Sequence, residues 1–354
     1  MKLQLHMMHA TPSENGYRMP AEWEPHEATW ISWPHAEGNS FPGSYDKVIP
    51  TFVKMAEALA QSEIVRINVI SPSQEKNVRQ LLKSCPPERI EFFHIPTDEP
   101  WCRDHGPVFL VRNENPRLVA VNFGFNAWGY KLSPFDEDNA VPPAIAKALG
   151  VPLIDESHFI LEGGSIDSNG QGVVLTTESC LLNANRNPSL DKTQIEKKLR
   201  DTLGFKTIIW LGDGIEGDDT DGHVDDITRF IAPATVITTV EEDESDPNFE
   251  PLQRNLDRLH TTRMPGGEPL HVFTLPMPTR IMREGQRLPA SYANFYIANS
   301  VVLLPVFGEA NDSWALSALH EAFPERRIVP IDCRELIWGL GAFHCLTQQQ
   351  PAIA

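Results

Sequence analysis

A cysteine near the C-terminus is surrounded by residue types that nucleophilic chemistry requires. Cys345 follows His344 directly, and Gly339 and Gly341 lie a few residues before it. A thiolate is the strongest nucleophile among ordinary side chains, and neighbouring glycines let a substrate approach the backbone closely. A lone cysteine is more often a small buried apolar residue, so Cys345 becomes a candidate nucleophile only because of residues found upstream.

Three upstream clusters bring together carboxylates, an imidazole and glycines. They are 101–107 with Asp104, 161–165 with Glu162, and 217–226 with His223 and Asp225. Each cluster comes just before an expected β-hairpin. If repeated units surround a common axis, equivalent strand entries meet near that axis, and we expect these four side chains to converge there with Cys345.

Taken singly, the clusters have ordinary explanations that stay open. Asp104 could form a surface ion pair with Arg103, which contributes little to stability. Glu162 before two glycines could be turn chemistry. The acidic run 217–226 could be a solvated loop or a calcium loop, although its spacing is not that of an EF-hand.

A site of this composition suits a reaction at a guanidinium carbon. Paired carboxylates match the N–H pairs of a guanidinium, a thiolate attacks an electrophilic carbon, and a histidine passes protons to a leaving amine and takes one from water. The expected reaction is deimination with release of ammonia. Because carboxylates disfavour ionisation of Cys345, a protonated His223 or the cationic substrate has to lower the pKa of the thiol.

The elements that position these residues repeat along the chain. Apolar stretches broken by turn residues predict four β-hairpins, and 29–33 could open a fifth that is completed elsewhere. The hairpins are expected at 108–123, 164–177, 227–240 and 295–306. Most are followed by a helix and a single strand, as in 190–203, with Ser189 as its cap, and 207–211. Cys345 is expected to begin, or to lie in, the closing strand.

Repeats that cannot bury their faces alone must stack or close into a ring. We therefore expect an α/β fold of repeated hairpin–helix–strand units, formed as one domain over 17–354 after a loose N-terminal segment at 1–16. Two unrelated α/β domains split near 134–139 are the alternative, but the repeated unit crosses that boundary.

Composition excludes several classes of protein. Of the 354 residues 41% are hydrophobic and 22% are charged, which is enough apolar material for a packed core. The sequence contains no apolar run of about 20 residues and no secretory signal. Five widely spaced cysteines without a CxxC pair indicate a reducing compartment, so we expect a cytoplasmic protein. The net charge of −18 disfavours nucleic acid and anionic lipid as partners and attracts cations.

Together, the motifs resemble those of the agmatine deiminase family, the bacterial and plant branch of the guanidine-modifying superfamily that includes the peptidylarginine and arginine deiminases. The stretches that carry the resemblance are 101–107, 126–129, 161–165, 182–188, 221–225, 291–299 and 344–349. The resemblance covers 19–351. It implies a five-bladed α/β propeller, the pentein fold, with its site on a pseudo-fivefold axis.

The resemblance also implies a role for each residue. Cys345 would form a covalent amidino-cysteine, His223 would be the general acid and base, Asp104 and Asp225 would hold the guanidinium, and Glu162 would orient His223 or meet the substrate. The reaction would convert agmatine into N-carbamoylputrescine and ammonia, a step of putrescine biosynthesis, without a metal or organic cofactor. A homo-oligomer is compatible with the sequence, but no motif decides the oligomeric state.

Two departures from the family pattern leave the substrate open. Leu340, Ala342 and Phe343 replace three positions of the usual Gly-Gly-Gly-Asn-Ile-His-Cys motif. Asp219 stands where the family often has a glutamate that meets the distal amine, and it is one methylene shorter. The alkyl chain would run along tryptophans, for which Trp101, Trp128 and Trp33 are the candidates.

Other functions remain open at this stage. The site could act on free arginine or peptidylarginine, or transfer the amidine group to an acceptor through the same covalent intermediate. An acidic ring alone could also serve a non-catalytic polyamine-binding protein, which would not need the thiol of Cys345.

Overall fold

The computed structural model describes residues 10–353, and within them five sheets share one internal order. In each of these sheets the first two strands are antiparallel, and a third strand pairs with the second strand and runs parallel to it. Four of them consist of β4 (Val108–Val111), β5 (Leu118–Gly124) and β6 (Leu153–Ile160); β7 (Asp167–Ser168), β8 (Val173–Thr177) and β9 (Thr207–Leu211); β10 (Thr228–Ala232), β11 (Thr235–Val240) and β12 (His271–Pro276); and β15 (Tyr296–Ile297), β16 (Val301–Val306) and β17 (Arg327–Asp332). The four hairpins expected from the sequence are therefore confirmed.

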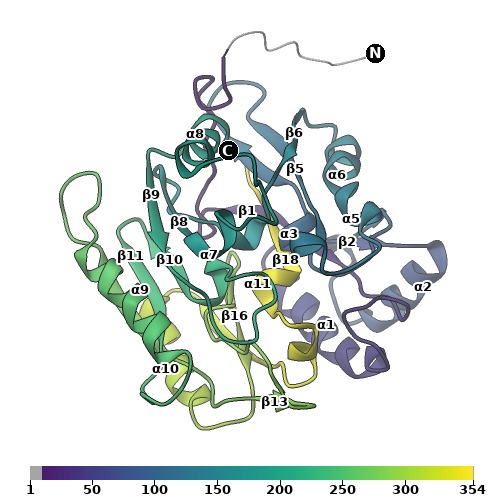
Figure 1. Cartoon of the computed structure of the whole chain (residues 1–354). Coiled ribbons are helices and arrows are strands. Elements are labelled where there is room, and N and C mark those ends of the chain that lie inside the picture. Colours follow the sequence, from purple (N-terminus) through teal and green to yellow (C-terminus); the bar gives the residue numbers. More distant parts are fainter. Residues whose placement is uncertain (1–9, 354) are drawn as a thin grey trace.

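The fifth sheet joins the two ends of the chain. Strand β18 (Thr347–Pro351) runs antiparallel to β1 (His26–Ser32), with Gln349 opposite Thr29. Strands β2 (Ile64–Val69) and β3 (Ile90–His94) extend it in parallel. The purple and yellow strands therefore lie side by side in the middle of the molecule (Figure 1). The prediction of a fifth unit completed elsewhere in the chain is confirmed.

Helices of nine residues or more connect the second and third strands of these sheets, or follow them. They are α1 (Tyr45–Leu59), α2 (Pro72–Leu81), α6 (Val141–Leu149), α8 (Lys192–Leu203), α9 (Phe249–Thr261) and α10 (Asp312–Ala322). Figure 1 shows α2, α6, α9 and α10 around the outside of the strands. In α8, Ile195, Leu199 and Leu203 are buried on one face, as the 3.6-residue period predicts.

The start of α8 differs from the prediction. Asp191, not Ser189, caps it: the Asp191 carboxylate accepts the Gln194 backbone N–H at 2.8 Å, and the Gln194 side chain accepts the Asp191 N–H at 2.8 Å. This reciprocal pair satisfies two N–H groups at once, which a serine two residues earlier cannot do.

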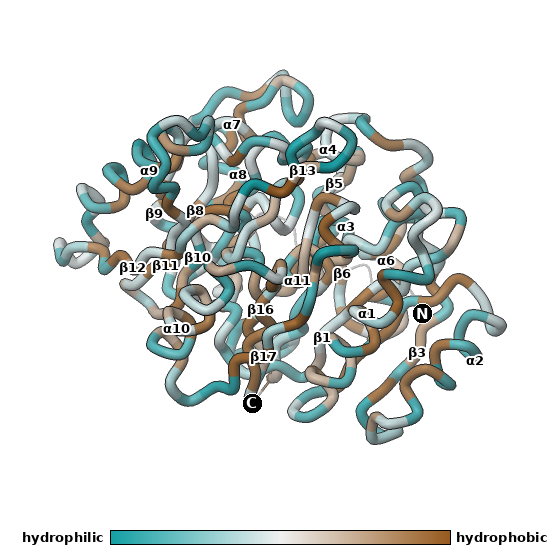
Figure 2. The backbone as a smooth tube through the Cα atoms, turned by 90° about the horizontal axis from the view of Figure 1, so that it is seen from below, coloured by the Kyte–Doolittle hydropathy of each residue, from teal (hydrophilic) through white to brown (hydrophobic). Residues whose placement is uncertain are grey.

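The apolar core follows the sheets. Figure 2 shows hydrophobic residues, in brown, along the strands in the interior, whereas the connecting loops are mostly hydrophilic. The largest cluster of buried apolar residues packs α1 and α10 against β2 and β16, and includes Phe52, Leu303 and Leu319. Because burying a large apolar side chain stabilises by roughly 1.5–3 kcal/mol, this packing keeps the strand entries in fixed places.

Four one-turn helical segments stand at strand entries, and they hold the polar clusters. These segments are α3 (Cys102–His105), η2 (Gly163–Ser165), η3 (Val224–Asp226) and α11 (Phe343–Leu346), which precede β4, β7, β10 and β18. Contacts link α3 with η2 and α11, and η2 with η3. Cys345 thus lies in α11 and not in the closing strand, so that prediction was wrong by one element.

Part of the predicted N-terminal segment, residues 1–9, lies outside the described residues. Residues 10–16 are described; they form a turn, and the Ser13 N–H donates to the Asp201 carbonyl at 3.0 Å. Within 10–353, no helix has both the length and the apolar character needed to cross a bilayer.

Candidate active site

Segments from five parts of the chain line one cavity. Its lining residues are Asn39, Ser40, Trp101, Asp104, Trp128, Leu132, Asp219, Thr220, Trp338, Gly339, Leu340, Gly341 and Cys345. Of the residues predicted for the site, Asp104, Cys345, Asp219, Trp101 and Trp128 are among them. The lining offers a thiol, two carboxylates and an apolar wall, and it includes no lysine or arginine.

Asp104 is a buried carboxylate held from several sides. The Trp128 indole N–H donates to its Oδ2 at 2.9 Å, and the Gly164 backbone N–H donates to its Oδ1 at 2.9 Å. The Nδ1 atom of His223 lies 3.7 Å from the same Oδ1. Trp128, predicted to line the substrate's alkyl chain, therefore also fixes the orientation of Asp104.

Cys345 is held by Asn294, a residue to which the sequence assigned no role. The Asn294 side-chain N–H donates to Cys345 Sγ at 3.0 Å. Its Oδ1 accepts the backbone N–H groups of His344 and Cys345, at 3.0 and 3.3 Å, which caps the turn that carries the thiol. The Sγ atom also lies 3.6 Å from Oδ2 of Asp225.

Three of the predicted side chains converge on Gly164. A Cβ atom at this position would lie 2.6 Å from Nδ1 of His223, 2.9 Å from Oδ1 of Asp104 and 3.0 Å from Oδ2 of Asp225. A side chain would fill the space these groups share, so glycine is required by close approach. His223 and Asp225 are fully buried behind the cavity wall. The predicted convergence of distant strand entries is thus observed.

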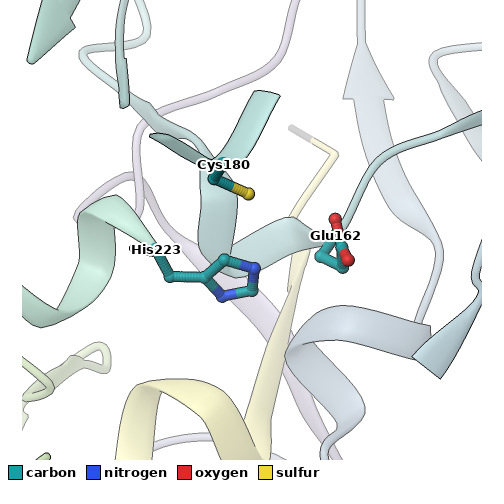
Figure 3. Close-up of side chains that lie close together, drawn as sticks. All are labelled: Glu162, Cys180 and His223. Atoms are coloured by element: carbon teal, nitrogen blue, oxygen red, sulfur yellow. The ribbon is translucent and has the colours of Figure 1, made fainter. Parts of the chain in front are cut away.

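Glu162 lies behind His223 and is fully buried. Figure 3 shows Glu162, Cys180 and His223 gathered in one place, and one ligating atom of each lies within 4.8 Å of the others. Glu162 Oε1 accepts the Arg186 Nε–H at 2.6 Å, so its carboxylate forms an ion pair, while its backbone carbonyl accepts the Ser165 N–H at 3.1 Å in the turn. Nothing in the spacing of Cys180 or Arg186 in the sequence pointed to this arrangement.

The buried charges shift the protonation of the site. Burial opposes the charged form of His223, but the carboxylate of Asp104 and the adjacent Cys180 outweigh it and raise the pKa of His223 well above its usual value. Burial, followed by the charge of Asp225, raises the pKa of Cys345 well above that of a free thiol. The predicted tension is therefore present: the imidazole is held protonated, and the carboxylates work against a thiolate.

The pKa values of two adjacent carboxyl groups, those of Asp225 and Asp226, are shifted in opposite directions. Burial and the charge of Asp225 raise the pKa of Asp226 well above its usual range. Burial acts the same way on Asp225, but the hydrogen bond and the charge of His344 outweigh it and lower the pKa of Asp225. Of the two, Asp225 therefore favours the carboxylate form, and Asp226 takes up a proton more readily.

Two groups of side chains have donor atoms close enough to share a metal ion. They are Glu162, Cys180 and His223, and Asp225, Asp226 and Cys345. In the first group the guanidinium of Arg186, 2.6 Å from Glu162, opposes a second cation. In the second, Asn294 already donates to both Asp226 and Cys345.

The chain as a whole matches a known protein family. The sequence pattern that defines the Porphyromonas-type peptidyl-arginine deiminase family matches residues 18–351. The chain belongs to this family. Curated members include putative agmatine deiminases of Legionella pneumophila (strain Paris), 38% identical over 346 residues with 97% of this chain and 98% of that protein covered, and of Selenomonas ruminantium, 37% identical over 367 residues with the same coverage.

Solved structures of agmatine deiminases have the same fold as this family member. The agmatine deiminase of Enterococcus faecalis superimposes with a TM-score of 0.90 at 36% identity, covering 98% of both chains. A C. jejuni agmatine deiminase variant with substrate bound gives 0.85 at 34% identity, covering 94% of this chain and 96% of that one. The chain therefore has the mixed α/β fold of these structures. The resemblance to the agmatine deiminase family that the sequence motifs indicated is confirmed.

Proposed function

We propose that this protein is an agmatine deiminase, which hydrolyses agmatine to N-carbamoylputrescine and ammonia. One observation carries the proposal: a single cavity is lined by the thiol of Cys345, the carboxylates of Asp104 and Asp219, and an apolar wall. Agmatine has a guanidinium, an alkyl chain and an ammonium in that order. The proteins similar to this chain whose names state an activity include agmatine deiminases.

The lining also favours agmatine over arginine. Free arginine carries an α-carboxylate, for which a protein site normally supplies a cation. The lining residues include no lysine or arginine, and Asp219 would repel a carboxylate. Peptidylarginine would have to place a polypeptide backbone against Trp338 and Leu340, where the wall is apolar.

In the proposed first half-reaction, Asp104 and Asp225 hold the guanidinium, and Cys345 Sγ attacks its central carbon. The protonated His223 gives its proton to the departing nitrogen as the C–N bond breaks, and ammonia leaves. The cysteine is then joined to the amidine carbon through a C–S bond. The cationic substrate and the Asn294 N–H oppose the carboxylates and favour the attacking thiolate.

In the proposed second half-reaction, neutral His223 takes a proton from water, and the hydroxide oxygen attacks the amidine carbon. The C–S bond breaks and the sulfur leaves as a thiolate. The hydroxyl proton passes to the released ammonia or to water as the C=O bond forms, and the carbamoyl product is released. Glu162 does not touch the substrate in this scheme; with Arg186 it supports His223 from behind. The steps draw on side chains and water, so the proposal includes no metal or organic cofactor.

Four further expectations belong to the same proposal. The five sheets of equal internal order support a five-bladed propeller around one axis, formed by 17–354 as a single domain. The five cysteines are free thiols, which supports a reducing, cytoplasmic location. The acidic net charge of −18 supports a small cationic substrate and disfavours nucleic acid or a membrane surface as a partner. A homo-oligomer is compatible with all of these.

The test is ammonia release from a panel of agmatine, arginine, a peptidylarginine, and guanidinoalkylamines with shorter or longer chains. We expect agmatine to have the highest kcat/KM. Cys345→Ser should bind agmatine and release no ammonia, whereas Cys333→Ser, which alters another buried cysteine, should retain turnover. If another guanidine is preferred, the substrate assignment fails. If Cys345→Ser retains turnover, the nucleophile assignment fails.

A further inference from the structure

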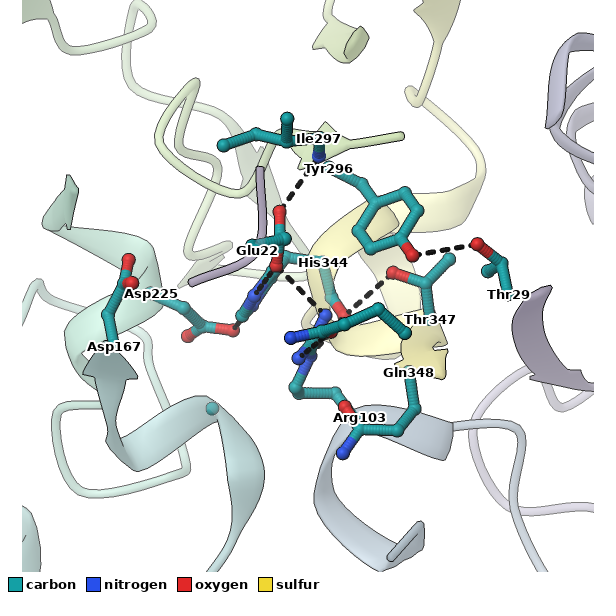
Figure 4. Close-up of polar contacts among 12 residues, drawn as sticks. Glu22, Thr29, Arg103, Asp167, Asp225, Tyr296, Ile297, His344, Thr347 and Gln348 are labelled. Atoms are coloured by element: carbon teal, nitrogen blue, oxygen red, sulfur yellow. Dashed lines mark hydrogen bonds and ion pairs between the residues drawn. The ribbon is translucent and has the colours of Figure 1, made fainter. Parts of the chain in front are cut away.

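The imidazole of His344 is wedged between two buried carboxylates (Figure 4). Its Nδ1 lies 2.7 Å from Oδ2 of Asp225, and its Nε2 lies 2.8 Å from Oε2 of Glu22. Ionised carboxylates only accept hydrogen bonds, so both ring nitrogens of His344 must carry hydrogen for both contacts to form. The geometry therefore describes an imidazolium that bridges Glu22 and Asp225.

Glu22 itself has little freedom to move. Its Oε1 accepts the Ile297 backbone N–H at 2.8 Å and lies 2.9 Å from the Arg229 guanidinium, while its Oε2 accepts from Arg103 at 3.1 Å. The side chain is 5% exposed. It comes from the turn that precedes β1, more than 200 residues before Asp225 in the chain, and it does not line the cavity.

We propose that Glu22 is a positioning residue, which through His344 holds Asp225 as a carboxylate turned toward the guanidinium and the attacking sulfur. The proposal rests on the proposed function, because Asp225 has to hold the substrate for its orientation to matter. Its structural basis is one shared atom: Oδ2 of Asp225 accepts from His344 and also lies 3.6 Å from Cys345 Sγ.

The electrostatics of the site show why Asp225 needs this support. It is buried beside Asp226 and near Asp104, and crowded carboxyl groups tend to take up protons. A protonated Asp225 could not pair with a guanidinium through both oxygens. The His344 cation counters this, because its hydrogen bond and charge lower the pKa of Asp225 against the effect of burial.

The charges around His344 come from several elements. Glu22 faces it from the N-terminal turn and Asp225 from η3, and the Nε–H of Arg103, in α3, donates to its backbone carbonyl at 3.3 Å. Arg229 in β10 and Asp167 in β7 pair with one another, Nε to Oδ2, at 2.5 Å next to Glu22. Of these, Glu22 is the group whose carboxylate meets Nε2, so Glu22→Gln takes away the charged acceptor on that side of the His344 ring.

The experiment compares Glu22→Gln with Glu22→Asp and the wild type. The amide keeps the size of the side chain and removes the charge, whereas the aspartate keeps the charge on a shorter chain. We expect Glu22→Gln to lower kcat/KM for agmatine on the order of 100-fold, because a misplaced holding group costs about that much. Glu22→Asp, which keeps the charge that faces the His344 ring, should recover part of this loss.

Glu63→Gln is the matched control. Glu63 is another buried carboxylate, 3.2 Å from Nδ1 of His26, and it accepts the Asn299 backbone N–H at 2.7 Å. Like Glu22 and His344, Glu63 and His26 form a buried carboxylate–imidazole pair. The Glu63–His26 pair does not contact Asp225 or Cys345. Glu63→Gln should lower the Tm and leave kcat/KM for agmatine close to that of the wild type.

A second readout does not depend on turnover. In protein with ¹⁵N-labelled histidine, the ring signals of His344, assigned with a His344→Gln variant, should change in Glu22→Gln and stay near their wild-type positions in Glu63→Gln. Unchanged ring signals and an unchanged kcat/KM in Glu22→Gln would overturn the proposal. If the wild type releases no ammonia from any guanidine, the proposed function fails, and the ring signals still decide whether Glu22 controls His344.

Discussion

Asn294 donates its side-chain N–H to Cys345 Sγ at 3.0 Å, and the same nitrogen lies 2.9 Å from Oδ1 of Asp226. Its carbonyl oxygen accepts the backbone N–H groups at the start of the turn that carries the thiol. One side chain thus sets the position of the sulfur and gives it a donor. Its hydrogen bond works against the neighbouring carboxylates in favour of a thiolate.

Replacing Asn294 with alanine should make the thiol harder to ionise. A hydrogen bond to a charged group contributes about 1.5–3 kcal/mol, which corresponds to about 10- to 100-fold in rate. We expect kcat to fall by that amount, and alkylation of Cys345 by iodoacetamide to need a higher pH than in the wild type. Asn68→Ala, which removes a buried asparagine bonded to Ser32, is the control and should not shift the alkylation profile. Alkylation at unchanged pH in Asn294→Ala would contradict the assignment.

Gly164→Ala should abolish activity without unfolding the protein. The added Cβ would come within 3.0 Å of His223, Asp104 and Asp225, so these groups have to move apart. A displacement of about 1 Å at reacting groups costs on the order of 100-fold in rate. Gly212→Ala is the control, since its Cβ would meet Asn255 at an ordinary 3.4 Å. Measured kcat and Tm should separate the two variants; an active Gly164→Ala enzyme would show that the three groups do not need their observed positions.

Protonation of Asp219 should make kcat/KM for agmatine fall at low pH. Burial and the repulsion of Asp218 raise the pKa of Asp219 to about 6. An acid with a raised pKa is charged only above that value, so the pairing with the distal ammonium is present above about pH 6 and is lost as the pH falls below it. We expect kcat/KM for agmatine to rise with pH through this value.

Butylguanidine, which lacks the distal amine, separates this effect from the titration of Asp104 and Asp226. The two substrates should differ in kcat/KM through pH 6 in the wild type and should show the same pH dependence in Asp219→Asn. Equal profiles in the wild type would mean that Asp219 does not meet the amine.

Chelators should change neither Tm nor activity. The acidic run 217–226 could be a calcium loop by composition, but its carboxylates are already engaged. Asp218 accepts backbone N–H groups of Thr220, Gly222 and His223, and Asp221 pairs with Lys131 and Arg186. Differential scanning calorimetry with and without EDTA tests this. A lower Tm that added calcium restores would support the calcium loop instead.

Much of the site could be predicted because the repeated topology places equivalent strand entries together. Asp104 and Asp225 lie in one-turn segments before the first strand of a sheet, and Glu162 comes directly before another such segment, which the hairpin pattern located correctly. Cys345 was placed in the strand and not in the turn before it, because the cap that forms this turn, Asn294, comes from a segment 50 residues earlier.

The partners of the site residues could not be predicted. Arg103 was weighed as a surface partner of Asp104, yet it is buried and pairs with Glu22. Arg186 behind Glu162 and His344 beside Asp225 are likewise pairs between residues distant in sequence. The hydrophobic periodicity and the composition of a segment carry no information about such pairs. These contacts form only when distant segments come together in the folded protein.

The sequence by itself determined the residue types, their place at strand entries and the family. The tertiary structure decided how readily each carboxyl group takes up a proton: the pKa of Asp225 is lowered and that of Asp226 is raised, although they are adjacent in the chain. The physical reason is that burial and charge act over a few ångströms in space. Against the effect of burial, His344, which is far from Asp225 in the chain, lowers the pKa of Asp225, whereas burial and the charge of Asp225 raise that of Asp226.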